Sequence, residues 1–204
     1  MKNKVPEEGA TKKEIKMTKQ ERPALILIDI QKAFDNIEYW GGQRNNLHAE
    51  DNCSTLLNFW REHNLPIFHI KHCSLSPASL LAEGNIGNDF KDIVKPSIGE
   101  TVIKKSVNSA FIGTDLKQQL DDNNIKKVVI IGLTTDHCVS TTIRMAGNYG
   151  YYTYIVSDAT ATFNKIGADG QRYSAEIIHE TALASLHQEF AIVVTTEALI
   201  KKLR

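Results

Sequence analysis

The sequence KVVIIGLTTDHCVSTTIRMAGNYGY, residues 127–151, joins a β-branched run to a helical pattern through a short polar segment. Residues 128–131 are four consecutive β-branched residues, which is typical of a strand covered on both faces of a parallel sheet. Apolar residues then recur at helical spacing, at Val139, Ile143 and Ala146, and Gly150 is placed to end the helix. The stretch therefore predicts a strand, a tight turn and a helix, with Cys138 in the first helical turn.

Cys138 has two interpretations at this position. Unpaired N–H groups and the positive end of the helix dipole meet at a helix start, so we expect the pKa of the Cys138 thiol to lie below its ordinary value. The same N–H groups are suited to hold an oxyanion. The alternative is that Cys138 is a small buried hydrophobic residue, as most intracellular cysteines are.

Composition excludes several classes of protein. The chain has 204 residues, 42% of them hydrophobic, which fits one globular domain. Its 24 basic and 24 acidic residues give zero net charge, which argues against partners such as nucleic acid or a membrane surface. There is no apolar run of the ~18 residues that a membrane span needs and no signal-peptide core, so we expect a cytoplasmic location.

The cysteine content and the amino terminus bound the chain further. Three cysteines without CxxC spacing fit a reducing compartment and argue against a disulfide framework or a structural zinc. Residues 1–22 are rich in charge and poor in large apolar groups, so we expect a disordered or loosely helical leader, with the folded domain at 23–204.

Strand and helix patterns alternate along the rest of the chain. Strands are expected near 24–28, 66–70, 101–104, 128–131, 151–156 and 191–194. Helices are expected near 47–60, after a cap at Thr114, over 139–150 and 171–187, and after a cap at Thr196. This order predicts a three-layer α/β/α, Rossmann-like fold with a six-stranded, mainly parallel sheet. The long irregular segment 72–97 is either a substrate-covering element or a plain surface excursion.

Three reactive side chains fall at or just past the carboxyl ends of predicted strands: Asp29, Lys105 and Cys138. In such folds ligands bind beyond the carboxyl ends of the strands, where the strand order reverses. A carboxylate can take the thiol proton and an ammonium can stabilise the thiolate while sulfur attacks a carbonyl. The three together indicate a nucleophilic hydrolase.

Four ordered segments carry a resemblance to a known family: ALILIDIQKAF, VIKKSVNSAFIGTDL, VVIIGLTTDHCVSTTIRMAGNYG and SDATATF. They resemble the isochorismatase-like cysteine hydrolases over about residues 23–200. The resemblance implies a six-stranded parallel sheet flanked by helices, with Asp29 as general base, Lys105 as the cation and Cys138 as nucleophile. The family's lysine lies six residues before the Phe of the SAF triplet, which selects Lys105. Lys104 would then point to the opposite face.

The resemblance also implies how an oxyanion is held. A cis peptide bond in the family corresponds here to Leu133-Thr134, and the N–H groups of Thr134 and Cys138 would form the oxyanion hole.

The resemblance bears on the reaction as well. Nicotinamidases carry an Asp-x-His pattern and further histidines that bind a metal. This chain has His69 and His72 but no Asp-x-His between its first and third strands, so we expect no metal and no cofactor. Members that cleave the vinyl ether of isochorismate lack the cysteine, so Cys138 favours hydrolysis of a small-molecule amide or related C–N bond through a thioester. HCSLSPASLLAEG with TTIRMAGNYG resembles the streptothricin hydrolase-like branch.

Other residues are candidates for the pocket or its surroundings. Gln31 and Phe34 either line the pocket or pack the loop, and His72 and Thr160 are expected to border the site. Asp136 and His137 adjoin the nucleophile, but neighbouring residues at a helix start diverge, so we expect them to cap the helix or face outward. His179 is expected on a helix surface or in an interface.

Two further expectations concern partners and rivals. We expect a small-molecule substrate and a homo-oligomer, either a dimer or a tetramer. Nicotinamidase-type and isochorismatase-type hydrolases remain alternatives, as does a non-catalytic α/β binding domain. A nucleotide-binding domain should carry a glycine-rich loop after its first strand, and IQKAF contains no glycine.

Overall fold

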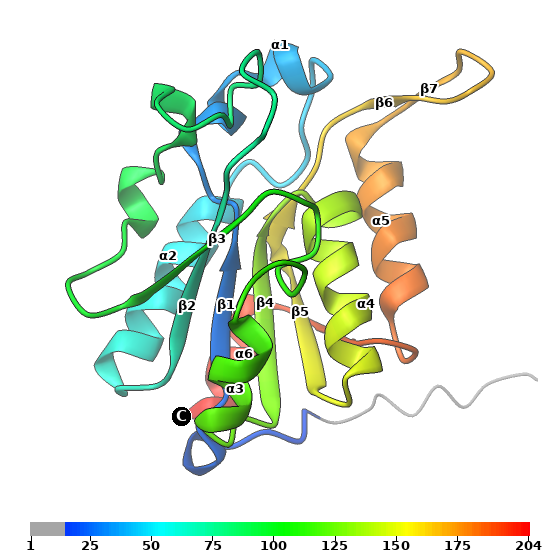
Figure 1. Ribbon diagram of the computed structural model, residues 1–204. Helices are drawn as coiled ribbons and strands as arrows, with labels where there is room; N and C mark the ends of the chain where they lie inside the picture. Colours follow the sequence, from blue (N-terminus) through cyan, green and yellow to red (C-terminus); the bar gives the residue numbers. More distant parts are fainter. Residues whose placement is uncertain (1–14) are drawn as a thin grey trace, which may run out of the picture.

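A computed structural model describes residues 15–204 and has three layers, with one sheet between two groups of helices (Figure 1). The six strands run in the order β3-β2-β1-β4-β5-β8 and every neighbouring pair is parallel. The strands are β1 Ala24–Ile28, β2 Ile67–His72, β3 Thr101–Lys105, β4 Lys127–Leu133, β5 Tyr152–Ala161 and β8 Ile192–Val194. The predicted fold class is therefore confirmed.

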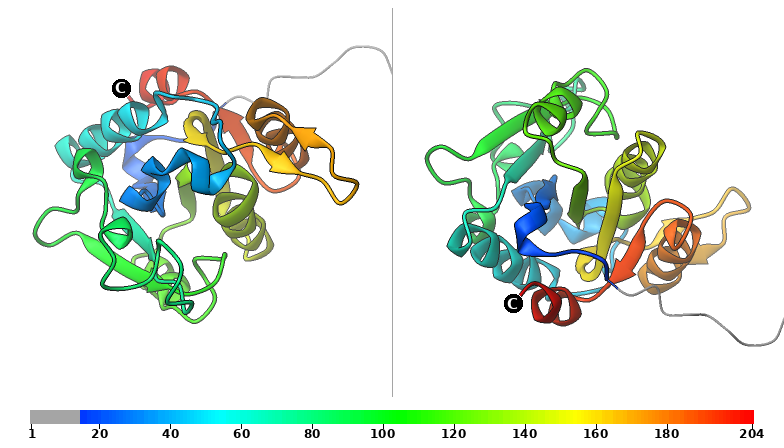
Figure 2. Two further views of the ribbon diagram at one scale, coloured as in Figure 1. Left: turned by 90° about the horizontal axis from the view of Figure 1, so that it is seen from above. Right: turned by 90° about the horizontal axis from the view of Figure 1, so that it is seen from below.

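The helices divide between the two faces of the sheet (Figure 2). One face is covered by α2 Ala49–Glu62 and α6 Thr196–Leu203, and the other by α3 Leu116–Asp122, α4 Ser140–Asn148 and α5 Ala175–Leu186. The short helix α1 Ile37–Trp40 lies over the carboxyl end of the sheet. None of the helices in residues 15–204 combines the length and apolarity needed to cross a bilayer.

The central strands β1 and β4 supply side chains to both cores. In β1, Ala24, Ile26 and Ile28 pack with α3 and α4, while Leu25 and Leu27 pack with α2. Alternate side chains of a strand point to opposite faces, and burying each large aliphatic one contributes about 2 kcal/mol. This is why both strands read as unbroken apolar runs.

The strand order reverses between β1 and β4, since β2 follows β1 on one side and β4 lies on the other. Asp29 follows β1 directly, and the turn Thr135–Val139, labelled η5, follows β4. The residue after β1 and the segment that carries Cys138 thus meet at the crevice where ligands bind in open α/β sheets.

Several element boundaries differ from the sequence prediction. Helix α5 begins at Ala175, because Arg172–Tyr173 forms β7, which pairs with β6 Lys165–Ile166 in an antiparallel hairpin. The last helix is capped by Thr195, whose hydroxyl accepts from the Ala198 N–H, and Asp115 rather than Thr114 precedes α3.

The folded part also starts earlier than predicted. Met17 is 1% exposed and Ile15 packs against the same core, so residues 15–22 do not belong to a disordered leader. Hydrophobic contact with the core outweighs the charged surroundings of these two side chains. Residues 1–14 of the predicted leader lie outside the described residues.

Gly132 brings the backbones of β1 and β4 together beside Asp29. Its φ is +117°, and a Cβ at this position would lie 2.1 Å from the Ile28 carbonyl oxygen. Asp29 itself has a φ of +50°, a left-handed conformation that Asp tolerates better than most residues. A side chain at position 132 would therefore push β4 away from the strand end that carries Asp29.

We predict that Gly132→Ala lowers the free energy of unfolding by about 3 kcal/mol or more, because it combines a disfavoured φ with a backbone clash. Gly150→Ala is the matched control: its φ is +85°, but no atom lies within 4 Å of the added Cβ, so about 1 kcal/mol is expected. Urea unfolding of both variants measures the difference. Equal losses would show that the close approach is not limiting.

Candidate active site

Asp29, Lys105 and Cys138 meet at the carboxyl end of the sheet, as their positions after three strands predict. Lys105 Nζ lies 2.6 Å from Asp29 Oδ2, and both side chains are at most 1% exposed. The ligand atoms of Asp29, His72 and Cys138 lie within 4.8 Å of one another. Carboxylate, ammonium, imidazole and thiol thus form one cluster.

The side-chain length of Lys105 follows from the strand order. Strand β2 lies between β3 and β1, so Lys105 must reach across roughly 10 Å of sheet to meet Asp29. His72, the last residue of β2, lies along this path. Lys104 points the other way, is exposed and pairs with Glu83 at 2.5 Å. The geometry agrees with the choice of Lys105 over Lys104.

The ammonium of Lys105 has a partner for each of its three hydrogens. It donates to Asp29 Oδ2 at 2.6 Å, to His72 Nδ1 at 3.0 Å and to the Val107 carbonyl at 3.2 Å. His72 Nδ1 must accept, so the imidazole is neutral and carries its hydrogen on Nε2. Burial, and then the charge of Lys105, lower the pKa of His72, which is consistent with this form.

The thiol of Cys138 is not the low-pKa group that the helix-start pattern predicted. Burial and then the neighbouring Asp29 carboxylate raise the pKa of Cys138, and Lys105 only partly opposes them. The turn also uses some of its own donors, because the His137 and Val139 N–H groups both donate to the Thr134 carbonyl, at 3.2 and 3.3 Å. The resting group is therefore a thiol beside a carboxylate that can accept its proton.

The segment that carries Cys138 is held from behind by α5. The Leu133-Thr134 peptide bond is cis, as the resemblance implied. The buried hydroxyl of Thr135 lies 2.9 Å from His179 Nδ1, and burial lowers the pKa of His179. His179 is 6% exposed, so its expected place on a helix surface is wrong. Its ring instead fixes the turn next to the nucleophile.

A cavity of about 290 Å³ opens onto the cluster. Its apolar wall is made by Phe34, Tyr39, Trp40 and Leu81, and its polar lining includes Ser79, Asn108, Thr134, His137 and Lys165. The rings of Phe34 and Trp40 stack with centroids 4.6 Å apart. The stacked rings give the cavity a flat apolar wall.

Two of the four predicted substrate-binding residues line this cavity, namely Phe34 and His72. Gln31 does not, because its buried amide donates to the carbonyls of His72 and Asn88 at 3.0 and 2.8 Å and accepts from the His72 N–H. Thr160 is fully buried in β5, where its hydroxyl donates to the Val156 and Ser157 carbonyls. Both residues support the backbone.

Asp136 and His137, the two residues before Cys138, lie in different environments. Asp136 accepts from Thr162 Oγ1 at 2.5 Å and lies 3.5 Å from Lys165 Nζ, so its carboxylate belongs to the rim of the site. His137 is more than half exposed and lines the cavity mouth. Sequence reasoning did not select Tyr39 and Trp40 from the short helix α1, Asn108 from a loop or Lys165 from the hairpin, because none of these segments has a distinguishing local pattern.

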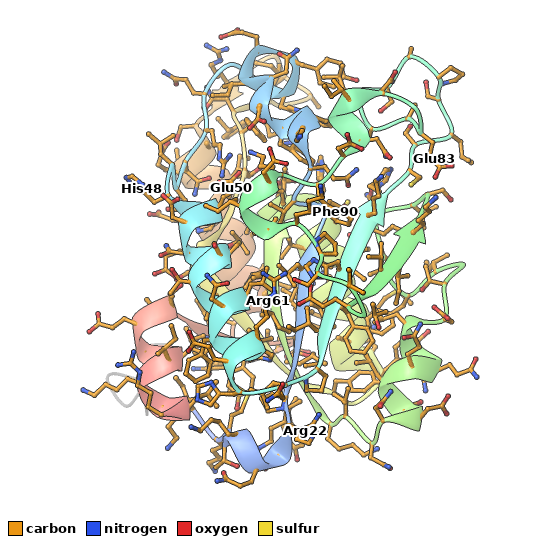
Figure 3. The ribbon with its side chains drawn as sticks, turned by 90° about the vertical axis from the view of Figure 1, so that its left-hand side faces the viewer. Arg22, His48, Glu50, Arg61, Glu83 and Phe90 are labelled. Atoms are coloured by element: carbon orange, nitrogen blue, oxygen red, sulfur yellow. The ribbon has the colours of Figure 1, made fainter. Side chains whose placement is uncertain are left out.

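The long segment 72–97 is tied down on the α2 side. Glu50, at the start of α2, accepts from Lys91 Nζ at 2.7 Å and from Arg44, and it lies beside this segment (Figure 3). The Lys91 N–H also donates to the Ile30 carbonyl. Ser79 and Leu81 from the same segment line the cavity. The segment is therefore a fixed wall of the site and more than a surface excursion.

Comparisons with known proteins show which family the chain resembles. The family model described as "Isochorismatase domain" matches residues 23–198. The chain is 50% identical over 181 residues to the uncharacterized isochorismatase family protein YrdC of Bacillus subtilis, covering 89% of this chain and 96% of that protein. It is 28% identical over 193 residues to nicotinamidase 3 of Arabidopsis thaliana, covering 88% of each. A crystal structure of an isochorismatase-family protein from Chromobacterium violaceum superposes with a TM-score of 0.86 at 41% identity, covering 89% and 93% of the two chains.

We predict that alkylation of Cys138 by iodoacetamide accelerates only at alkaline pH, because burial and Asp29 raise its pKa. Asp29→Asn removes a negative charge and should move the labelling curve to lower pH, whereas Lys105→Met removes a positive charge and should move it higher. A Cys73→Ala background restricts labelling to Cys138, since Cys53 is 1% exposed. Mass spectrometry across the pH range reads the curve. Shifts of the opposite sign would exclude this electrostatic account.

Proposed function

Because the chain belongs to the isochorismatase family of hydrolases, we propose that it hydrolyses a small-molecule amide or related C–N bond through a thioester on Cys138. The observation that carries the proposal is the cluster of Asp29, Lys105 and Cys138, two of which, Asp29 and Cys138, line a cavity. The nicotinamidase among the relatives supports an amide as the class of bond.

The first half of the reaction begins with the resting thiol. Asp29 takes the proton of Cys138 as sulfur attacks the amide carbonyl, so the thiolate need not exist before the substrate arrives. The C=O becomes a tetrahedral oxyanion, which the N–H groups of Thr134 and Cys138 would hold. Asp29 then gives its proton to the nitrogen, the C–N bond breaks, and ammonia or an amine leaves the thioester.

The second half uses the same groups in reverse. Asp29 takes a proton from water, the hydroxide attacks the thioester carbonyl, and the C–S bond breaks. The thiolate regains the proton from Asp29, and a carboxylic acid is released. Lys105 remains charged throughout and stabilises each anionic stage at Asp29 and sulfur. His72 holds the lysine in place by accepting one of its hydrogens.

The cavity favours a compact substrate. A volume of about 290 Å³ with stacked Phe34 and Trp40 rings accommodates a planar acyl group of few atoms. Lys165 and His137 at the mouth offer polar contacts to its far end. The cytoplasmic location and the dimeric or tetrameric state stay predictions from the sequence.

A screen of primary amides, ureides and nicotinamide, read out as released ammonia, tests the function. We expect turnover of at least one compound and a loss of about 10³-fold or more in Cys138→Ala, the blank. Rapid quench with a slow substrate should give an acyl adduct whose mass maps to Cys138. Full activity in Cys138→Ala would rule out the thioester route.

We also predict that turnover survives exhaustive chelation. His69 is fully buried on the other side of β2, where Nε2 lies 2.8 Å from Glu100, so it cannot join His72 at a metal. A nucleophile activated by Asp29 needs no Lewis acid. Activity is compared before and after dialysis against a chelator, with metal content measured in parallel. Loss of activity that one added metal restores would contradict the proposed mechanism.

A further inference from the structure

The cluster at the active site has the donor set of a transition-metal site. Asp29, His72 and Cys138 offer oxygen, nitrogen and sulfur atoms within 4.8 Å of one another. Carboxylate, imidazole and thiolate are the three side-chain ligands of Zn²⁺, and three protein ligands plus water form an open zinc site. Asp29 Oδ2 and His72 Nδ1 also accept hydrogen bonds from Lys105 Nζ. A cation already lies among them, and that cation is an ammonium.

A second observation points to an unused ligand position. Asp29 is only 1% exposed, and its Oδ1 atom is buried without a hydrogen-bond partner in residues 15–204. Buried carboxylate oxygens ordinarily have partners. His72 Nδ1, by contrast, already accepts a hydrogen bond from Lys105 Nζ, so its lone pair becomes free for coordination only when the ammonium moves away.

We infer that Asp29, His72 and Cys138 form a binding site for a thiophilic divalent metal ion of the zinc class, whose place is held by the ammonium of Lys105 in the active enzyme. A metal bound there would inhibit the proposed hydrolysis. This consequence rests on the proposed function, whereas the metal binding itself does not. Ligand atoms around a tetrahedral zinc are separated by roughly 3.5 Å, so the cluster must contract by roughly 1 Å. Rotation of the Cys138 side chain supplies part of this movement.

The exchange balances without any redox step. The ion forms bonds to Asp29 oxygen, His72 Nδ1 and Cys138 sulfur, the S–H bond breaks, and its proton passes to solvent. The Lys105 ammonium is displaced from the cluster or loses a proton to solvent. Sulfur is then bound to the metal and unavailable as a nucleophile, so the metal inhibits, and a chelator reverses the inhibition.

Co²⁺ is the probe, because cobalt bound to thiolate gives a ligand-to-metal charge-transfer band and tetrahedral cobalt gives intense visible bands. We expect one equivalent to bind wild-type protein with both signals, and Zn²⁺ to displace it. Cys138→Ala should lose the charge-transfer band. Cys73→Ala, which removes a half-buried thiol outside the cluster, should keep both the band and the amide turnover. A band that persists in Cys138→Ala, or no binding by wild type, would overturn the inference.

Lys105→Met gives the sharpest test. Removing the competing ammonium should tighten Co²⁺ binding by about tenfold or more, although catalysis is lost. Because the variant leaves Asp29 without its cation, metal should also raise its melting temperature more than that of wild type. Lys105→Gln is a second neutral variant should Lys105→Met fold poorly. Weaker or unchanged binding in the folded variants would refute the competition.

The two proposals fail in different ways. Cobalt binding through Cys138 without amide turnover would overturn the proposed function and leave the metal site standing. Turnover through a Cys138 adduct that is insensitive to Zn²⁺, with no cobalt band, would overturn the metal site alone.

Discussion

The buried ion pair between Lys105 and Asp29 is the interaction on which the site depends. Removing two charges from water carries a penalty of several kcal/mol per ion, which close contact and further hydrogen bonds must offset. Here the contact is 2.6 Å, and His72 and the Val107 carbonyl take the other two hydrogens of the ammonium. The pair links the ends of β3 and β1 across β2. Gln31 and Asn88 fix the end of β2 through hydrogen bonds to the backbone of His72 and to each other.

The same pair explains why the nucleophile is stored in its neutral form. A carboxylate beside a half-buried thiol favours the proton on sulfur, and the lysine is already engaged by three acceptors. In the proposed reaction the thiolate of Cys138 is therefore generated only when a carbonyl is present to receive it. Such a thiol also reacts slowly with oxidants, because the thiolate is the form of cysteine that oxidants attack.

Much of the fold and part of the site could be read from the sequence, for reasons that differ by residue. The runs 24–28 and 128–131 are apolar throughout because both faces of their strands are covered, and this made the central strands recognisable. The meeting of Asp29, Lys105 and Cys138 follows from a topological rule about strand ends. The direction in which the pKa of Cys138 is shifted could not be predicted in this way, since a local helix-start pattern does not include Asp29, a carboxylate that is distant in sequence.

Other misjudged residues depend on partners in remote segments. The sequence predicts equally well that Gln31 lines the pocket or that it packs the loop. In the structure its amide forms hydrogen bonds with Asn88 and with the backbone of His72. His179 follows Ala175 by four residues and precedes Ala182 by three, which places it on the buried face of α5. Its polarity argued for the surface, but both ring nitrogens have partners that offset its burial: the Thr135 hydroxyl lies 2.9 Å from Nδ1 and Asn46 Nδ2 lies 3.4 Å from Nε2.

Because of the close approach at Gly132, the central strands that position Asp29 and Cys138 are distinct from the segments that form the cavity walls. Main-chain contact between the two central strands sets how closely β4 approaches the strand end that carries Asp29, and Gly132 places no side chain between them. The walls of the cavity, by contrast, come from residues outside the central strands, including Phe34, Trp40, Leu81 and Lys165. Mutations in these walls can alter which molecule fits without moving the reacting atoms. Substrate range can therefore drift during evolution while the hydrolytic apparatus stays intact, and a redesigned cavity can inherit its catalytic geometry unchanged.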